Sequence, residues 1–384
     1  AITAYSEALR LDPENASARY NRGRSYMLVG NDHLALADFD GLLRHKPDDV
    51  ASLCSRGDVW VRTGAYAKAV SDYNRALHLD PEDAIVFINR ANCHVELGNL
   101  TQAITDYSEA IRLSPHDTRA FAGRGLTHLQ LGSFSKAVDD YTEALRLSPD
   151  NGKCYISRGL AYFQQGQFEE ALADYAQAIR CDPQDARAAL GRGLIYFRQG
   201  DYRRAWVNFD QAVRLKVDFP AAIIGRGDAA AKLGDFDQAA ADYAEALRLD
   251  PADSSILLKR GNAYFKQGDY ERAVADYDEL LQHDPKDAGA YFNRASSYHQ
   301  LGDDQQALSD YYEATLLNPG DGNAHYNLAC LLTRQGQLEL ALSSLERAFD
   351  AVPTLIENAG GDPDLEPLHH DPGFQALIGS LPIS

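Results

Sequence analysis

The chain has 384 residues, of which 45% are hydrophobic and 24% are charged, a balance typical of folded globular proteins. No stretch approaches the roughly 18 consecutive apolar residues that a membrane-spanning helix needs, so we do not expect membrane insertion. The 37 Lys and Arg residues against 56 Asp and Glu residues give a formal net charge of −19; such a surface repels phosphate backbones, and nucleic acid is not an expected partner.

Three kinds of residue recur every 34 positions. Prolines fall at Pro13, Pro47, Pro81, Pro115, Pro149, Pro183, Pro251, Pro285, Pro319 and Pro353, with Val217 in the single gap. Glycines keep the same interval from Gly30 to Gly336, and alanines keep it from Ala1 to Ala341. A fixed period of this length indicates an array of structural repeats.

Each repeat is predicted to contain two helices. In the first repeat, Gly23 and Tyr26 mark one helix, and Gly30 ends it in a left-handed cap. Ala35 and Phe39 lie on the apolar face of a second helix, which stops at Pro47.

In chain order, residues 1–15 are predicted to be the second helix of a truncated repeat, residues 16–355 ten repeats, and residues 356–384 a C-terminal capping segment. The ten repeats are 16–49, 50–83, 84–117, 118–151, 152–185, 186–219, 220–253, 254–287, 288–321 and 322–355. The cap is predicted from Phe374, Leu377, Ile378 and Leu381, which stand at helical spacing and would cover the last hairpin.

The repeat resembles the tetratricopeptide pattern W-x2-L-G-x2-Y, A-x3-F, P, with Gly23, Tyr26, Ala35, Phe39 and Pro47 in the matching places. The tail resembles the ending of many bacterial arrays of this family. The resemblance implies an all-α fold, a right-handed superhelical solenoid of antiparallel helix hairpins, whose first helices line a concave groove. It also implies an interaction scaffold that holds other proteins.

The clearest departure from that pattern is a column of arginines where the family usually has leucine. It comprises Arg22, Arg56, Arg90, Arg124, Arg158, Arg192, Arg226, Arg260 and Arg294, and it ends in Leu328. A column of acidic residues on the second helices runs from Asp38 to Asp310, with Asn208 in one repeat, and ends in Ser344. Because both columns end in the same repeat, we expect each arginine to pair within its own repeat, as Arg90 with Asp106. The alternative is that the arginines bind a phosphate or carboxylate of a ligand.

No motif for nucleotide binding, zinc hydrolysis or serine hydrolysis occurs, so we expect neither catalytic residues nor a cofactor. His94 and His128 share one column and could face each other. Since two ligands without a third seldom make a metal site, we predict none. Five cysteines without a CxxC pair suit a reducing, cytoplasmic compartment. Residue 1 falls in mid-helix, so we expect a piece of a longer protein.

The candidate partner-binding site lies on the groove face of repeats 118–253. On a solvated helix this stripe should be polar, but here Gly123, Leu126, Leu160, Gly191 and Leu194 occupy it. Its apolar flanks are Leu129, Ile156, Phe163, Leu190 and Phe197, and its basic rims are Arg119, Lys153 and Arg187 at one end and Arg198, Lys232 and Lys266 at the other. We predict that it binds an apolar, acid-flanked peptide or amphipathic helix of a partner protein.

Two known ligand modes of the family fit less well. Asn89, Asn92 and Arg119 are only fragments of the set that clamps a chaperone's terminal carboxylate, and the groove asparagine ladder of sugar-transferase arrays is interrupted at Gly123, Gly191 and Lys259. Two further functions stay open: an accessory domain of an enzyme whose catalytic part lies upstream, and a structural array that associates with copies of itself.

Overall fold

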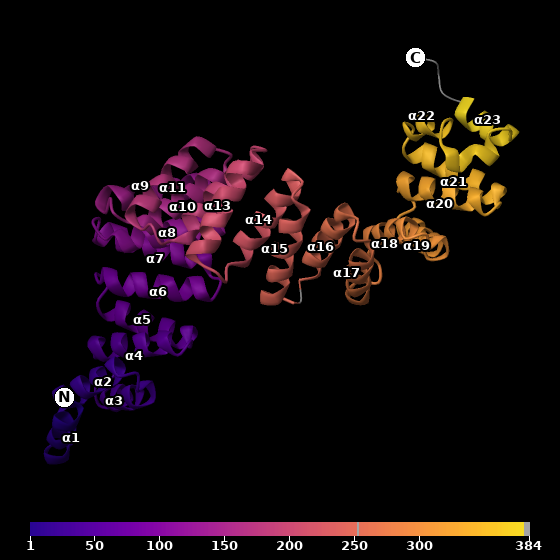
Figure 1. Cartoon of the computed structure of the whole chain (residues 1–384). Helices are drawn as coiled ribbons and strands as arrows, with labels where there is room; N and C mark the ends of the chain where they lie inside the picture. The colour runs from indigo at the N-terminus through magenta and orange to yellow at the C-terminus, as the bar shows by residue number, and fades with distance from the viewer. Residues whose placement is uncertain (252, 380–384) are drawn as a thin grey trace. The chain divides into compact units, whose positions relative to one another are not determined.

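The computed structural model describes residues 1–251 and 253–379, and throughout these residues the secondary structure is helical, with no β-strand (Figure 1). The all-α prediction and the solenoid of consecutive helix pairs are confirmed. The chain divides into two compact units, Ala1–Ile195 and Tyr196–Ser384, and the division falls inside helix α12.

The helices of the first unit follow one another in pairs after a single leading helix. They are α1 (Ile2–Leu11), α2 (Ala16–Leu28), α3 (Asp32–His45), α4 (Val50–Arg62), α5 (Tyr66–Leu79), α6 (Ala84–Glu96), α7 (Leu100–Leu113), α8 (Thr118–Gln130), α9 (Phe134–Leu147), α10 (Gly152–Gln164), α11 (Phe168–Cys181) and the greater part of α12 (Ala186–Arg198).

The second unit continues the alternation and ends in three short helices. They are α13 (Tyr202–Leu215), α14 (Pro220–Leu233), α15 (Phe236–Leu249), α16 (Ser254–Gln267), α17 (Tyr270–His283), α18 (Ala288–Gln300), α19 (Asp304–Leu317), α20 (Gly322–Arg334), α21 (Leu338–Ala351), α22 (Leu355–Ala359), the 3-10 helix η1 (Pro363–Leu368) and α23 (Pro372–Gly379).

Local chemistry explains where the helices of a hairpin start and stop. In the first complete repeat, the Asn15 side chain accepts a hydrogen bond from the Ala18 amide and caps α2. Gly30, with φ at 79°, turns the chain in the left-handed region, as predicted. Phe39 is fully buried, and its ring lies 3.0 Å from where a Cβ on Gly23 would stand. Glycine at this position therefore lets the two helices approach.

The tail covers the apolar end of the last hairpin. Leu365, Leu368 and Phe374 are fully buried in a cluster with residues of α20 and α21. The Tyr326 hydroxyl donates to Asp362 Oδ2 at 2.7 Å and ties the tail to α20. Leu381 lies outside the described residues.

The predicted arginine–aspartate pairs form inside the hairpins. In eight repeats, arginine Nη2 lies 2.6–2.7 Å from the first oxygen of the aspartate in the same repeat, and Nε also donates to that carboxylate. Only 17–24% of each arginine side chain and 3–8% of each aspartate side chain is exposed. These guanidinium groups are held between helices by protein partners, which supports the structural interpretation over ligand binding. We call this series the ladder.

In most repeats a third bond joins the ladder arginine to the repeat before it. Arg56 Nη1 donates to Asp40 Oδ1 at 2.6 Å, Arg90 to Asn74 Oδ1 at 2.8 Å, and Arg124 to Ser108 Oγ at 3.0 Å. The sequence predicts pairing inside the repeat only, but the planar guanidinium carries five donors and can bind the second helices of two repeats at once, as Arg56 does. Most ladder arginines therefore also link successive hairpins.

We predict that Asp174→Ala lowers the free energy of unfolding by about 2–4 kcal/mol, because Arg158 keeps its charge in a site that is 17% exposed. Chemical denaturation followed by circular dichroism measures the change. The control is Glu143→Ala, which removes an exposed pair with Arg146 and should cost below about 0.5 kcal/mol. Equal losses in the two variants would contradict a structural role for the ladder. The double change Arg158→Leu with Asp174→Ser, which copies Leu328 and Ser344, should recover most of the loss.

Candidate functional site

Three leucines at the predicted site form an exposed stripe on the first helices of the first unit. Leu126 on α8 is 48% exposed, Leu160 on α10 is 40% exposed, and Leu194 on α12 is 38% exposed. At the equivalent position the other repeats have a polar residue or a cysteine: Arg24, Asp58, Asn92, Asp228, Asn262, Ser296 and Cys330. We call these three residues the leucine stripe.

Most polar residues in this column are engaged inside the protein. Asp58 Oδ1 accepts a hydrogen bond from the Tyr73 hydroxyl at 2.6 Å and another from Asn89 Nδ2 at 3.3 Å. Asn92 Oδ1 accepts from the Tyr107 hydroxyl at 2.5 Å. Leucine offers no acceptor for such a tyrosine. The stripe therefore replaces an internal hydrogen-bonding position with exposed apolar surface.

The two glycines predicted in the floor of the groove have another role. A Cβ on Gly123 would lie 2.5 Å from the ring of Tyr107, and a Cβ on Gly191 would lie 2.3 Å from the ring of Tyr175. Each glycine makes room for the tyrosine of the preceding repeat, and Gly191 is buried. The interpretation of these glycines as ligand-facing was wrong, because a ring from the neighbouring repeat fills the space.

The apolar flanks are half-buried and belong partly to the core. Leu129 packs against the cluster around Tyr141, and Ile156 and Phe163 pack against the cluster around Tyr175. Leu190 is half-buried as well. The exposed apolar surface at the predicted site is therefore narrower than the sequence suggested and consists mainly of the leucine stripe.

Two cations of the predicted rim are paired locally. Arg119 Nη2 lies 2.6 Å from Asp117, and Arg187 Nη2 lies 2.5 Å from Asp185; each pair lowers the pKa of its carboxyl group. Lys153 is exposed and adds to the positive field at Asp185. The positive charge at this rim is therefore weaker than a count of arginines and lysines indicates.

The remaining predicted residues lie in the second unit. Phe197 and Lys232 line a cavity of about 350 Å³ together with Asp228, Lys259 and Lys266. Lys259 Nζ donates to both oxygens of Asp228 at 2.8 Å. Arg198 is exposed. In the sequence, Lys259 is notable only because it interrupts the column of asparagines. Its occurrence on the same helix as Lys266 was the signal that could have predicted a basic pocket.

The two column histidines each lie beside a ladder pair. His94 Nε2 is 4.0 Å from Asp106, and His128 Nε2 is 3.9 Å from Asp140. Their Nδ1 atoms are buried and have no hydrogen-bond partner, and burial lowers the pKa of both rings. This arrangement favours two neutral rings in the core.

A second group of possible metal ligands serves the cap. Cys330, Asp362 and Asp364 have ligand atoms within 4.8 Å of one another. Asp362 already accepts from Tyr326 through Oδ2 and from the Asp364 amide through Oδ1 at 3.0 Å. Burial raises the pKa of the Cys330 thiol, so the thiolate that a metal needs is disfavoured.

Among the described residues, no helix combines the length and the apolar character required to cross a lipid bilayer. Sequence models of the TPR repeat match residues 1–30 and 159–200, and models of the tetratricopeptide repeat match residues 30–84, 88–152, 196–254, 224–282, 258–322 and 322–353. A search of curated proteins gave no match.

Solved structures similar to this chain are also repeat proteins. The C-terminal part of a TPR repeat-containing protein from Cytophaga hutchinsonii is 18% identical, with a TM-score of 0.53 over 62% of this chain and 97% of that protein. A tetratricopeptide repeat protein from Parabacteroides merdae is 22% identical, with a TM-score of 0.46 over 67% of this chain and 98% of that protein. YrrB, a TPR protein with an unusual peptide-binding site, is 23% identical, with a TM-score of 0.40 over 48% of this chain and 95% of that protein.

We predict that His94→Tyr with His128→Tyr makes stability less sensitive to acid. The folded pKa of each histidine lies below the unfolded value of about 6.5, so the unfolded chain binds more protons and stability falls as the pH drops below that value. Thermal melts between pH 7 and 5 should show a shallower loss in the double variant. An unchanged slope in the double variant would contradict the assignment.

Proposed function

The chain belongs to the tetratricopeptide repeat family, and from this premise we propose that its leucine stripe binds a segment of a partner protein. The fold supports a protein-interaction scaffold, and proteins of this family are generally non-catalytic. The partner segment would be an extended peptide or an amphipathic helix with leucine-sized apolar side chains.

The observation that carries this proposal is the contrast between repeats of the same chain. Leu126, Leu160 and Leu194 replace polar residues at one position in three consecutive repeats, and each remains more than a third exposed. Scattered surface leucines need no explanation, but three that recur at one position of successive first helices point to a shared apolar binding surface. Contact between α8 and α10 places the first two on neighbouring helices.

Charge adds a preference for acidic flanks. In the first unit, Lys153 is the exposed cation of the predicted rim without a local cap carboxylate, whereas Arg119 and Arg187 are paired with their own caps. In the second unit, Lys232, Lys259 and Lys266 line one cavity with a single carboxylate, Asp228. An acidic group of a partner would interact favourably with the lysines at either location, although the chain as a whole is strongly acidic.

The size of the stripe limits the affinity. Covering the exposed part of each leucine contributes roughly 1 kcal/mol, so the stripe supplies about 3 kcal/mol and the neighbouring half-buried side chains add to it. Association and ordering costs offset much of this gain, and we expect micromolar-scale binding.

We predict that Leu160→Asp with Leu194→Asp abolishes capture of the partner while helicity stays unchanged. Quantitative pull-down from the source cells, read by mass spectrometry, compares this variant with the wild type. The matched control is Leu97→Asp with Leu131→Asp, because these leucines are 41% and 47% exposed but lie beside the turn glycines, away from the stripe. Undiminished capture by the stripe variant, or equal loss in the control, would refute the proposal.

A further inference from the structure

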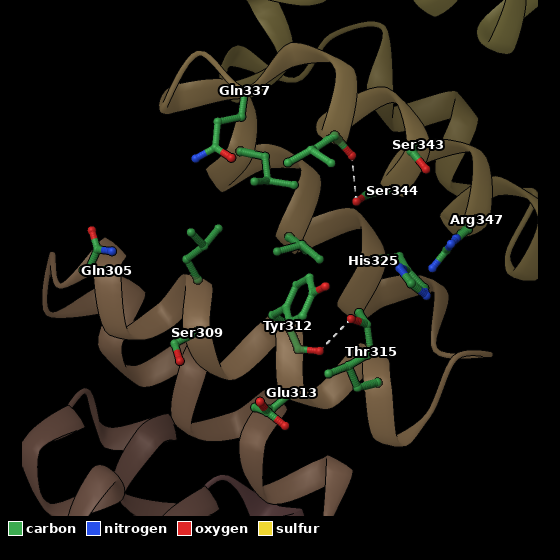
Figure 2. Close-up of a pocket in the computed structure, with 15 residues that line it drawn as sticks. Gln305, Ser309, Tyr312, Glu313, Thr315, His325, Gln337, Ser343, Ser344 and Arg347 are labelled. Atoms are coloured by element: carbon green, nitrogen blue, oxygen red, sulfur yellow. Dashed lines mark hydrogen bonds between the residues drawn. The ribbon is translucent and has the colours of Figure 1, made fainter.

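A groove lined by five leucines and by polar side chains lies between two second helices near the C-terminal end of the second unit. The cavity has a volume of about 420 Å³ and is lined by residues of α19 and α21, together with Leu328 and Leu332 of α20. Gln305 and Gln337 stand at one end, and Arg347 stands near the other (Figure 2). We call this cavity and the residues that line it the terminal groove.

The groove exists where the ladder ends. In the other repeats with a pair, the guanidinium group binds the aspartate of its own second helix, and in most of them it also bonds to the second helix before it. Here Leu328 takes the place of the arginine and Ser344 takes the place of the aspartate. The Ser344 hydroxyl turns back and donates to the Leu340 carbonyl at 2.9 Å (Figure 2). No guanidinium group from this position of α20 therefore fills the space between α19 and α21.

Three residues that line this groove are apolar or aromatic and stay more than half exposed. They are Tyr312 at 56%, Leu316 at 58% and Leu340 at 57%. In the other repeats, the position of Leu316 holds Arg10, Arg44, His78, Arg112, Arg146, Arg180, Arg214, Arg248, Gln282 or Asp350. The position of Leu340 holds Lys68, Gln102, Lys136, Glu170, Arg204, Gln238, Arg272 or Gln306, with Leu34 as the exception. The terminal groove therefore has leucine at two positions that are polar or charged in nearly all other repeats.

The charges along the groove are also rearranged. Arg347 stands at the position held by Glu109, Glu143, Glu245, Glu279 and Glu313 in other repeats, and its guanidinium makes no ion pair with any described residue. Glu109, Glu143 and Glu245 each bind an arginine three residues later, but the residue three after Glu313 is Leu316. Glu313 and Arg347 both line the groove, so α19 offers a negative edge and α21 a positive one.

We infer that the terminal groove binds an amphipathic helix of a partner protein. The helix would place a ridge of leucine-sized side chains on Leu328 and Leu332, an acidic residue toward Arg347 and a basic residue toward Glu313. A small molecule inside the cavity would leave most of the exposed rim in water, whereas a helix lying along α19 and α21 would cover it. Residues 305–316 of α19 run beside the groove for about 16 Å, which corresponds to three turns of a bound helix.

The test uses a display library of helical peptides with a randomised apolar face and randomised flanking charges. The protein is the selection target, and the double variant Leu328→Arg with Ser344→Asp is used for counter-selection. That variant restores the pair found in eight other repeats, so it should fold normally and fill the groove. We expect enriched peptides with apolar residues at helical spacing and an acidic residue on one edge, with at least tenfold weaker binding to the double variant.

Arg347→Glu should switch the enriched flanking residue from acidic to basic. The stripe variant Leu160→Asp with Leu194→Asp should bind the selected peptides as the wild type does, so failure of the stripe and failure of the groove are distinguishable. Enrichment of no sequence above counter-selection would overturn the inference. So would concentration-dependent dimerisation that Leu328→Arg with Ser344→Asp abolishes, because the occupant would then be a second copy of this chain.

Discussion

The arginine–aspartate pair found inside eight of the repeats is the interaction on which the rest of the structure depends. A guanidinium and a carboxylate that are both largely shielded from water must occur together, because removing one member of such a pair typically costs about 3–5 kcal/mol. Within this chain, both members are absent together in the last repeat, at Leu328 and Ser344, while one repeat keeps Arg192 with the neutral Asn208. The third bond, as from Arg56 to Asp40, joins most of these hairpins to the one before and makes the pair a link between repeats.

Because the arginine–aspartate pairs recur inside the repeats, the residues that stabilise the array occupy different positions from the residues that face solvent. Gly30, Phe39 and their equivalents fix the hairpin, while the position of Leu160 lies on the first-helix surface and the position of Leu316 on the second-helix surface. Both proposed binding surfaces occur where solvent-facing positions change from polar to apolar. They lie on different helices of the hairpin, so the same repeat architecture can present two unlike surfaces.

The period predicted the fold because proline fixes its φ angle and glycine readily adopts the left-handed conformation, so the two residues mark most of the turns between helices. It also predicted the ladder. The arginine column ends at Leu328 and the aspartate column ends at Ser344 in the same repeat, which indicates that each arginine pairs with the aspartate of its own repeat. The bonds to the preceding repeat were not predicted, because their acceptors differ in type, as Asp40, Asn74 and Ser108 do. Gly123 and Gly191 were misread because the tyrosine that fills each site comes from another repeat. A comparison of equivalent positions in the repeats therefore does not predict the contacts that one repeat makes with the next.

The most direct test of the account is amide hydrogen exchange on the chain with its captured partner bound. The account predicts added protection concentrated on the first helices α8 and α10 and the part of α12 before Ile195, where the leucine stripe lies. The second helices α9 and α11, held against them by the ladder, should exchange as in the free protein. Protection confined to α9 and α11, or none in residues 118–195, would contradict the claim that the stripe is the binding surface.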